Sequence, residues 1–317
     1  MRLGADHVRV HVPATSANLG PGFDSLGLAL GVRDELDVRT TGARGAAVLV
    51  TGEGANELPR GEAHLVVRAV RRALDHVGAP QTGLHLTCTN RIPHGRGMGS
   101  SAAAVVAGIL AARGLIDDPL ALDDSVVLRL ATELEGHPDN AAPAILGGAT
   151  IAWTDDDGPR AVRVATHPGL TPVVLVPCTR LATAHARSVL PAAVPHADAA
   201  FQAGRAALLI EALTRRPDLL LPATEDRLHQ RYRAAVMPGS LALVDALRER
   251  GVAAVVSGAG PTVLALARST GDGTCDADDA VRDVVVATGA DWRILHPGVA
   301  DAGARVDRVS SATAPTG

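Results

Sequence analysis

Pro93-His94-Gly95-Arg96-Gly97-Met98-Gly99-Ser100-Ser101-Ala102 is the most informative segment of this 317-residue chain. It follows Leu84 to Cys88, whose alternating apolar residues predict a strand, and it leads into Ser100 to Arg113, a run of small residues that predicts a buried helix. Glycines at alternate positions allow backbone N–H groups to converge on one point, and the start of the helix adds unpaired donors and the positive end of its dipole. The segment therefore predicts a phosphate-binding loop. The alternative is a structural glycine-rich turn before a helix.

The chain has no lysine, and all 30 of its basic side chains are arginine. A Walker-A P-loop and a protein-kinase site both need a lysine on the phosphates, and Schiff-base enzymes need a lysine amine. These three classes are excluded. A phosphate site in this chain has to rely on backbone N–H groups and arginine.

Outward from the glycine-rich segment, strands and helices alternate in both halves of the chain, and the first half opens with strands joined by short loops. This order predicts an α+β arrangement of layers. The predicted strands cover residues 8–12, 26–30, 35–39, 84–89, 172–176, 253–256 and 263–267, and the predicted helices cover 64–76, 100–113, 125–135, 197–214 and 240–250. The residues from Pro13 to Asp24 are predicted as a loop, because proline, glycine and small polar residues dominate there. We expect an N-terminal domain over 1–162, a C-terminal domain over 163–309 and a flexible tail over 310–317.

The composition of the chain indicates where the protein is located and excludes some classes of partner. The formal net charge of −4 and the few aromatics (two Trp, one Tyr, two Phe) argue against a nucleic-acid partner. The longest apolar run, Ala102 to Ala112, is too short to cross a bilayer, and the N-terminus has no signal-peptide pattern. Cys88, Cys178 and Cys275 are odd in number and far apart, which predicts reduced, buried residues. We expect a cytoplasmic protein without a membrane partner.

Three segments together resemble the GHMP kinase superfamily: Pro93 to Ala102, the Pro13 to Asp24 loop and the Ser257 to Thr262 turn. The first is similar to the superfamily signature P-x-x-x-G-L-G-S-S-A, with Met98 in place of leucine. The resemblance implies a two-domain fold, in which an N-terminal domain like the second domain of ribosomal protein S5 precedes a ferredoxin-like domain. It also implies that ATP binds at Pro93, Gly95, Arg96, Gly97, Met98, Gly99, Ser100, Ser101 and Ala102.

Within the superfamily, the Pro13 to Asp24 loop, Glu135 to Gly148 and Thr183 to Pro195 resemble the homoserine kinases. This resemblance implies ATP-dependent phosphorylation of the side-chain hydroxyl of L-homoserine, a step of threonine biosynthesis. The substrate is a small zwitterion, so its site needs an anion for the ammonium group and a cation for the carboxylate. The resemblance implies Asn18 and Asp24 for the ammonium group, Arg187 and Arg233 for the carboxylate, and further contacts from His137 and Asn140.

The resemblance also implies a magnesium ion on the phosphates, held by Glu133 and by the hydroxyl of Ser101 or Ser100; the sequence does not decide between the two serines. Glu135 is the competing carboxylate. As catalytic residues we expect Asn140, which positions the acceptor hydroxyl without taking its proton, together with Arg187 and Thr183. We expect a homodimer. Two alternatives stay open: a kinase of the same fold that acts on a mevalonate-type acid or a sugar, and a non-catalytic relative that binds ligands.

Overall fold

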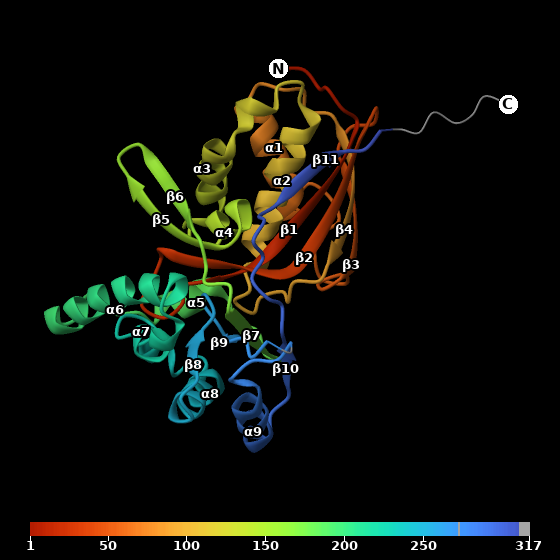
Figure 1. The fold of residues 1–317 in the computed structure, drawn as a ribbon. Helices are drawn as coiled ribbons and strands as arrows, with labels where there is room; N and C mark the ends of the chain where they lie inside the picture. Colours follow the sequence, from red (N-terminus) through yellow and green to blue (C-terminus); the bar gives the residue numbers. More distant parts are fainter. Residues whose placement is uncertain (272, 311–317) are drawn as a thin grey trace.

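Two β-sheets with helices packed on them make up this α+β protein, as Figure 1 shows for a computed structural model that describes residues 1–271 and 273–310. The predicted α+β class is confirmed. Except for Ser310, the predicted tail lies outside the described residues.

The first sheet has seven strands, and helices cover one of its faces. Its strands are β1 (His7–Ala17), β2 (Leu26–Thr41), β3 (Ala46–Gly52), β4 (Gly83–Asn90), β5 (Ala149–Asp155), β6 (Gly158–Val164) and β11 (Arg305–Arg308). Its helices are α1 (Leu65–His76), α2 (Ser100–Leu115), η1 (Pro119–Leu122), α3 (Asp124–Glu135) and α4 (Ala141–Leu146). The strands run in the order β11-β1-β2-β4-β3, with β5 and β6 attached to the start of β2. Helix α2 lies between α1, α3 and β1, which explains why its side chains are small and mostly buried.

The second sheet is smaller and follows the order β10-β7-β9-β8. Its strands are β7 (Leu170–Pro177), β8 (Ala253–Val256), β9 (Val263–Arg268) and β10 (Trp292–Leu295). Its helices are α5 (Thr183–Ser188), α6 (His196–Thr214), η2 (Pro217–Leu219), α7 (Leu220–Ala223), η3 (Arg231–Arg233), α8 (Pro238–Glu249) and α9 (Asp278–Thr288). All three pairings between neighbouring strands of this sheet are antiparallel. When its four strands are numbered in chain order, they lie side by side in the order 4-1-3-2, as the predicted ferredoxin-like topology requires.

Two parts of the sequence-based assignment were wrong. Residues Pro13 to Ala17 are not loop: β1 continues through them, with a β-bulge between Pro13 and Ala14, and only the residues after Ala17 form the loop. The two short strands expected over 26–30 and 35–39 are one strand, β2. In both places, pairing with the neighbouring strand overrides weak local preference.

The C-terminal segment of the described chain returns to the first sheet. Strand β11 pairs with β1, and just before it Gly298 and Ala300 bond to the backbone of Gly31 and Ala29 in β2. Figure 1 shows this segment leaving β10 and running up beside β1. The last strand of the first sheet thus comes from the range expected to form the C-terminal domain. The division at 162/163 stays a prediction.

The cysteines are free, Cys88 and Cys275 are buried as expected, and Cys178 is exposed, contrary to the expectation. Among the described residues, no helix combines the length and the apolar character that a membrane span requires.

Candidate active site

A cavity of about 410 Å³ lies where the two halves of the chain meet. Its wall contains most of the residues singled out in the sequence: Asn18, Gly95, Arg96, Gly97, Gly99, Ser100, Ser101, Ala102, His137, Asn140, Thr183, Arg187 and Arg233. Pro93, Met98, Asp24 and Glu133 are not part of that wall. Pro93 and Met98 are buried, and Met98 is fully enclosed in the core, so they support the loop from behind.

The glycine-rich loop leads into α2 with its glycines in the left-handed backbone region. Gly95, Gly97 and Gly99 have φ values of 65°, 75° and 67°. A Cβ at Gly99 would lie 1.9 Å from the Thr15 hydroxyl oxygen, so glycine is required there for space as well as for conformation. Gly99 is the N-cap of α2, so no side chain at this position accepts from the first N–H groups of the helix. Gly99, Ser100 and Ser101 line the cavity, which leaves these N–H groups beside it. Ser100 and Ser101 are the first two residues of α2 and therefore do not cap it.

The three sequence motifs meet at this loop. The Ser257 hydroxyl donates to the Gly97 carbonyl at 2.6 Å and accepts from the Ser16 hydroxyl at 2.8 Å, and the Thr15 N–H donates to the Met98 carbonyl at 3.1 Å. Segments more than 150 residues apart in sequence thus hold the loop in one conformation.

Ser101 contacts a carboxylate, but that carboxylate is Glu135 and not Glu133. The Ser101 hydroxyl donates to Glu135 Oε1 at 2.6 Å, and Glu135 lines the cavity. Burial raises the pKa of the Glu135 carboxyl. Glu133 instead lies on the outer face of α3, where it pairs with Arg72 at 2.8 Å. The structure therefore does not bring Glu133 to the site, because the end of α3 turns Glu135 and not Glu133 toward α2.

Asp24 and Arg187 form a two-pronged ion pair. Arg187 donates from Nη1 to Asp24 Oδ2 at 3.1 Å and from Nη2 to Asp24 Oδ1 at 2.6 Å. The hydrogen bond with Asp24 raises the pKa of Arg187. Asn18 Oδ1 accepts from the Asp24 N–H at 3.0 Å, and Asn18 Nδ2 donates to the Gly258 carbonyl at 2.9 Å. Asn18 and Asp24 are non-glycine residues with positive φ, 70° and 56°, so the loop holds both in an unusual conformation.

Arg233 is almost fully enclosed, with 1% of its surface exposed, yet it reaches the cavity wall. Its guanidinium donates to the carbonyls of Ala186 (3.1 Å) and Gly258 (3.3 Å) and to His229 Nδ1 (3.0 Å). None of these partners is a carboxylate, and burial lowers the pKa of Arg233. A buried cation without a paired anion is a favourable place for the carboxylate of a ligand.

His137, Asp139 and Asn140 form a short polar chain at the start of α4. His137 Nδ1 lies 2.5 Å from Asp139 Oδ1, and this hydrogen bond raises the pKa of His137. Asn140 Oδ1 accepts from the Thr15 hydroxyl at 2.8 Å, so its amide NH₂ group remains for Asp139 (3.4 Å) and the cavity. Thr183, the first residue of α5, also lines the cavity.

A second, more apolar cavity of about 170 Å³ adjoins the first and shares Leu58, Leu65, His94, Ser100 and Ser101 with it. The aliphatic side chains of Val12, Leu36 and Val66 contribute to its wall. His64 also lines it: His64 Nδ1 accepts from the Val66 N–H at 3.3 Å, and His64 Nε2 is buried without a hydrogen-bond partner in the described structure.

Sequence reasoning missed Glu135 as the glutamate of the site, and it did not find His64, His94, Leu58 or Leu181. Glu135 had a signal, since it was the weighed competitor of Glu133. His64 had only its position before a helix, which is typical of a cap. The apolar residues carry no local signal, because an isolated leucine is ordinarily core.

Two protein-family models match parts of this chain. The family model described as GHMP kinases N terminal domain matches residues 64–148, and the one described as GHMP kinases C terminal matches residues 198–281. The homoserine kinase of Streptomyces coelicolor is 54% identical over 96% of each chain, and that of Leifsonia xyli is 50% identical over 97% of this chain and 94% of its own.

Among solved structures, the homoserine kinase of Cytophaga hutchinsonii has a TM-score of 0.82 at 26% identity, covering 96% of this chain and 98% of its own. A mevalonate kinase from L. major has a TM-score of 0.63 at 18% identity, covering 93% of this chain and 94% of its own, which shows a shared fold alone. The superfamily resemblance and the two-domain GHMP kinase fold are thus confirmed. With half or more of its residues identical to the homoserine kinases of Streptomyces coelicolor and Leifsonia xyli over nearly its whole length, this chain belongs to the homoserine kinase family of the GHMP kinases.

Proposed function

We propose that this protein transfers the γ-phosphoryl group of ATP to the side-chain hydroxyl of L-homoserine. One observation carries the proposal beyond the family: a backbone cradle suited to phosphate and two arginines suited to a carboxylate line the same cavity of about 410 Å³, and Asp24 is paired with one of those arginines. The cradle is the Gly95 to Ser101 loop with the first turn of α2, and the groups that suit a zwitterion are Asp24, Arg187 and Arg233.

At the phosphate end, backbone N–H groups and the dipole of α2 replace the lysine that the chain lacks. Arg96 contributes less than the sequence implied, because its guanidinium donates to the carbonyls of Pro177 and Cys178. The loop is rigid enough to act as a preformed site, since β1 and the Ser257 to Thr262 turn hold it from two sides.

The residues beside the loop fit a magnesium ion. Mg²⁺ prefers hard oxygen ligands and is usually held by one or two carboxylates together with substrate phosphates, and Glu135 with the Ser101 hydroxyl offers that donor set at the phosphate cradle. We propose Glu135 in place of Glu133. Bound there, the ion would neutralise charge on the transferring phosphates.

For the substrate end we propose an exchange of ion pairs. Without substrate, Asp24 and Arg187 satisfy each other. The ammonium group of homoserine would take Asp24 and the Asn18 side chain, while its carboxylate would take Arg187 and Arg233. A ligand with only one charge, such as mevalonate, would leave one member of the Asp24–Arg187 pair without a partner, and a neutral ligand such as galactose would supply no charge to either member. The pair therefore favours zwitterions.

We propose that Asn140, which lines the cavity, holds the acceptor hydroxyl. An amide cannot accept the hydroxyl proton as a base, but phosphoryl transfer through a loose transition state depends mainly on positioning and charge neutralisation. The Thr15 hydroxyl fixes the Asn140 carbonyl, so its NH₂ group is the one available to the hydroxyl oxygen. Thr183 also lines the cavity and is a second candidate contact.

We place the adenine ring in the adjoining cavity of about 170 Å³. Its aliphatic wall fits the low aromatic content of the chain. Because His64 Nδ1 accepts a hydrogen bond, its proton lies on Nε2, which is a buried donor without a partner among the described residues. A ring nitrogen of adenine would satisfy it. A homodimer and a cytoplasmic location remain predictions from the sequence.

The proposal is tested by ADP release from the purified protein with Mg-ATP and L-homoserine, mevalonate, galactose or no acceptor. We expect strong stimulation by L-homoserine alone. Turnover with another acceptor would overturn the substrate and retain the phosphate site, and ATP binding without turnover on any acceptor would favour a non-catalytic relative.

A further inference from the structure

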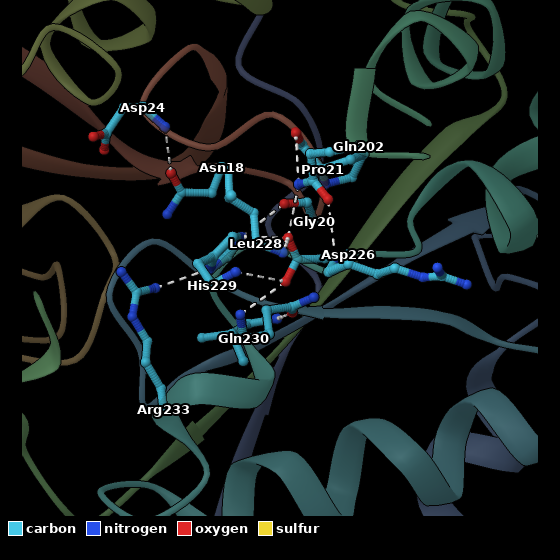
Figure 2. A network of polar contacts seen from close by, with 12 residues as sticks. Asn18, Gly20, Pro21, Asp24, Gln202, Asp226, Leu228, His229, Gln230 and Arg233 are labelled. Atoms are coloured by element: carbon cyan, nitrogen blue, oxygen red, sulfur yellow. Dashed lines mark hydrogen bonds and ion pairs between the residues drawn. The ribbon is translucent and has the colours of Figure 1, made fainter. Parts of the chain in front are cut away.

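His229 is a fully buried histidine that lies beneath the active site without lining its cavity. Figure 2 shows its ring between the Gly20 carbonyl, which belongs to the loop after β1, and Arg233. His229 Nε2 lies 2.7 Å from the Gly20 oxygen, and His229 Nδ1 lies 3.0 Å from Arg233 Nη1. The imidazole therefore joins segments 209 residues apart in sequence.

The two partners determine where the imidazole proton is. A carbonyl oxygen only accepts a hydrogen bond, so Nε2 must carry the proton toward Gly20, and a guanidinium only donates, so Nδ1 must be the acceptor toward Arg233. A buried carboxylate, Asp226, lies 3.5 Å from Nε2 and also favours a proton there. Burial lowers the pKa of His229, which agrees with a neutral ring.

The segment that carries His229 is itself fixed. The Asp226 carboxylate accepts from the N–H groups of Leu228 (3.0 Å), His229 (3.2 Å) and Gln230 (2.8 Å). Gln202 donates both to Asp226 at 2.7 Å and to the Pro21 carbonyl at 3.0 Å. The histidine backbone thus has little freedom, and its ring can impose an orientation on its neighbours.

His229 contacts the residues that hold the two charged groups of the proposed substrate site. These groups are the guanidinium of Arg233 and the carboxylate of Asp24, the residue after Phe23. Arg233 receives one of its few acceptors from His229, and the Phe23 ring stacks on the His229 ring with centroids 5.0 Å apart and 25° between planes. Phe23 directly precedes Asp24, and both arginines of the site lie near its ring, Arg187 at 5.5 Å and Arg233 at 5.6 Å. A substitution at His229 would therefore affect both the group that binds the substrate carboxylate and the loop that binds the substrate ammonium group.

We propose that His229 is a positioning residue that sets the orientation of Arg233 and of the Gly20 to Asp24 loop for binding of the amino-acid substrate. This inference rests on the proposed function, since it assumes that Arg233 receives the substrate carboxylate. Because His229 does not line the cavity and contacts Arg233, its effect should fall on the affinity for L-homoserine and not on that for ATP.

His229→Phe and His229→Gln separate this role from simple packing. Phenylalanine keeps a flat ring that can stack on Phe23 but removes both hydrogen bonds, whereas the glutamine amide keeps a donor and an acceptor at similar spacing. We expect His229→Phe to raise KM for L-homoserine about 10- to 100-fold, the factor for one hydrogen bond to a charged group, with KM for ATP within about threefold. His229→Gln should stay within about fivefold of the native KM. Thermal unfolding of each variant checks the fold, and His229→Asn, which is too short to reach Gly20, replaces His229→Phe if that variant is unfolded.

A double-mutant cycle with Arg233→Met decides whether His229 acts through Arg233. In the Arg233→Met background, the rise in KM for L-homoserine caused by His229→Phe should be at least about threefold smaller than in the native background, because only the part that acts through the Gly20 to Asp24 loop is left. An undiminished effect in that background, an equal rise in KM for ATP, or a folded His229→Gln variant with KM raised tenfold or more would overturn the inference. A native enzyme that does not phosphorylate L-homoserine would refute the proposed function instead, and turnover of the native enzyme is therefore measured first.

Discussion

Exchanging Glu135 for glutamine tests the proposed metal site most sharply, because the sequence pointed to Glu133 and the structure points two residues further on. Glutamine keeps the size of the side chain, and its carbonyl oxygen can still accept from Ser101, which donates at 2.6 Å in the native protein. The variant loses the negative charge beside the phosphate cradle. Since burial raises the pKa of Glu135, removing that charge should not destabilise the fold.

The expected change in the Mg²⁺ requirement differs between Glu135 and Glu133, because the surroundings of the two side chains differ. Loss of even an outer partner of a metal ligand typically costs about 10- to 100-fold in metal affinity or activity, so loss of a ligand should raise the Mg²⁺ concentration for half-maximal activity at least about tenfold. Glu133→Gln is the matched control. It breaks an ion pair with Arg72 whose side chains are 44% and 36% exposed, a contact worth about 0–1 kcal/mol, and should leave the Mg²⁺ requirement within about twofold.

The assay is the initial rate of ADP release against free Mg²⁺ concentration at saturating ATP and L-homoserine, for the native protein and both variants. Thermal unfolding without nucleotide checks that both variants are folded. An unchanged Mg²⁺ requirement in Glu135→Gln, or a larger change in Glu133→Gln, would refute the assignment of Glu135.

Other predictions concern the substrate pair, the loop and a helix cap. Arg187→Met leaves Asp24 unpaired, and steady-state kinetics should show KM for L-homoserine raised about 100-fold with KM for ATP within about threefold; equal changes in both would contradict the pairing. Gly99→Ala places a Cβ 1.9 Å from the Thr15 hydroxyl oxygen at a positive φ, so it should cost at least about 1–3 kcal/mol in urea unfolding and weaken ATP binding, and a variant of native stability would refute the steric argument. Asp123→Ala removes the cap of α3 and should cost about 1 kcal/mol at neutral pH. Hydrogen bonds to the carboxylate lower the pKa of Asp123, so its contribution to stability is present above the usual Asp pKa and is lost as pH falls through the lowered pKa. Urea unfolding of the native protein and the variant at neutral pH and at about pH 3 measures this loss. A stability difference that does not change with pH would contradict the reasoning.

The phosphate loop could be predicted because its chemistry is local. Gly95, Gly97 and Gly99 adopt positive φ at alternate positions of one short segment, and the small residues after them fit a mostly buried helix. Pro13 to Ala17 could not be predicted as strand, since proline, alanine and serine have weak strand preference and only pairing with β2 keeps them extended. Strand β11 was missed for the same reason, as its partner β1 lies about 300 residues away in sequence.

The sequence was a better guide to which residues form the site than to which of them contact each other. Asp24 and Arg187 could each be named from a motif, but the sequence does not show that they bind each other across 163 positions. The choice between Glu133 and Glu135 depends on how α3 packs against α1 and α2, which a motif does not specify. His229 carried no signal at all, because its role depends on acceptors and donors supplied by Gly20 and Arg233.

The most direct test of the account compares kcat/KM for three acceptors under Mg-ATP: L-homoserine, 4-hydroxybutanoate, which lacks the ammonium group, and 3-aminopropan-1-ol, which lacks the carboxylate. If Asp24 and Arg187 exchange their mutual ion pair for the two charges of the substrate, both truncated acceptors should fall at least about 100-fold below L-homoserine. Either truncated acceptor within about tenfold of L-homoserine would contradict the claim that this site recognises a zwitterion.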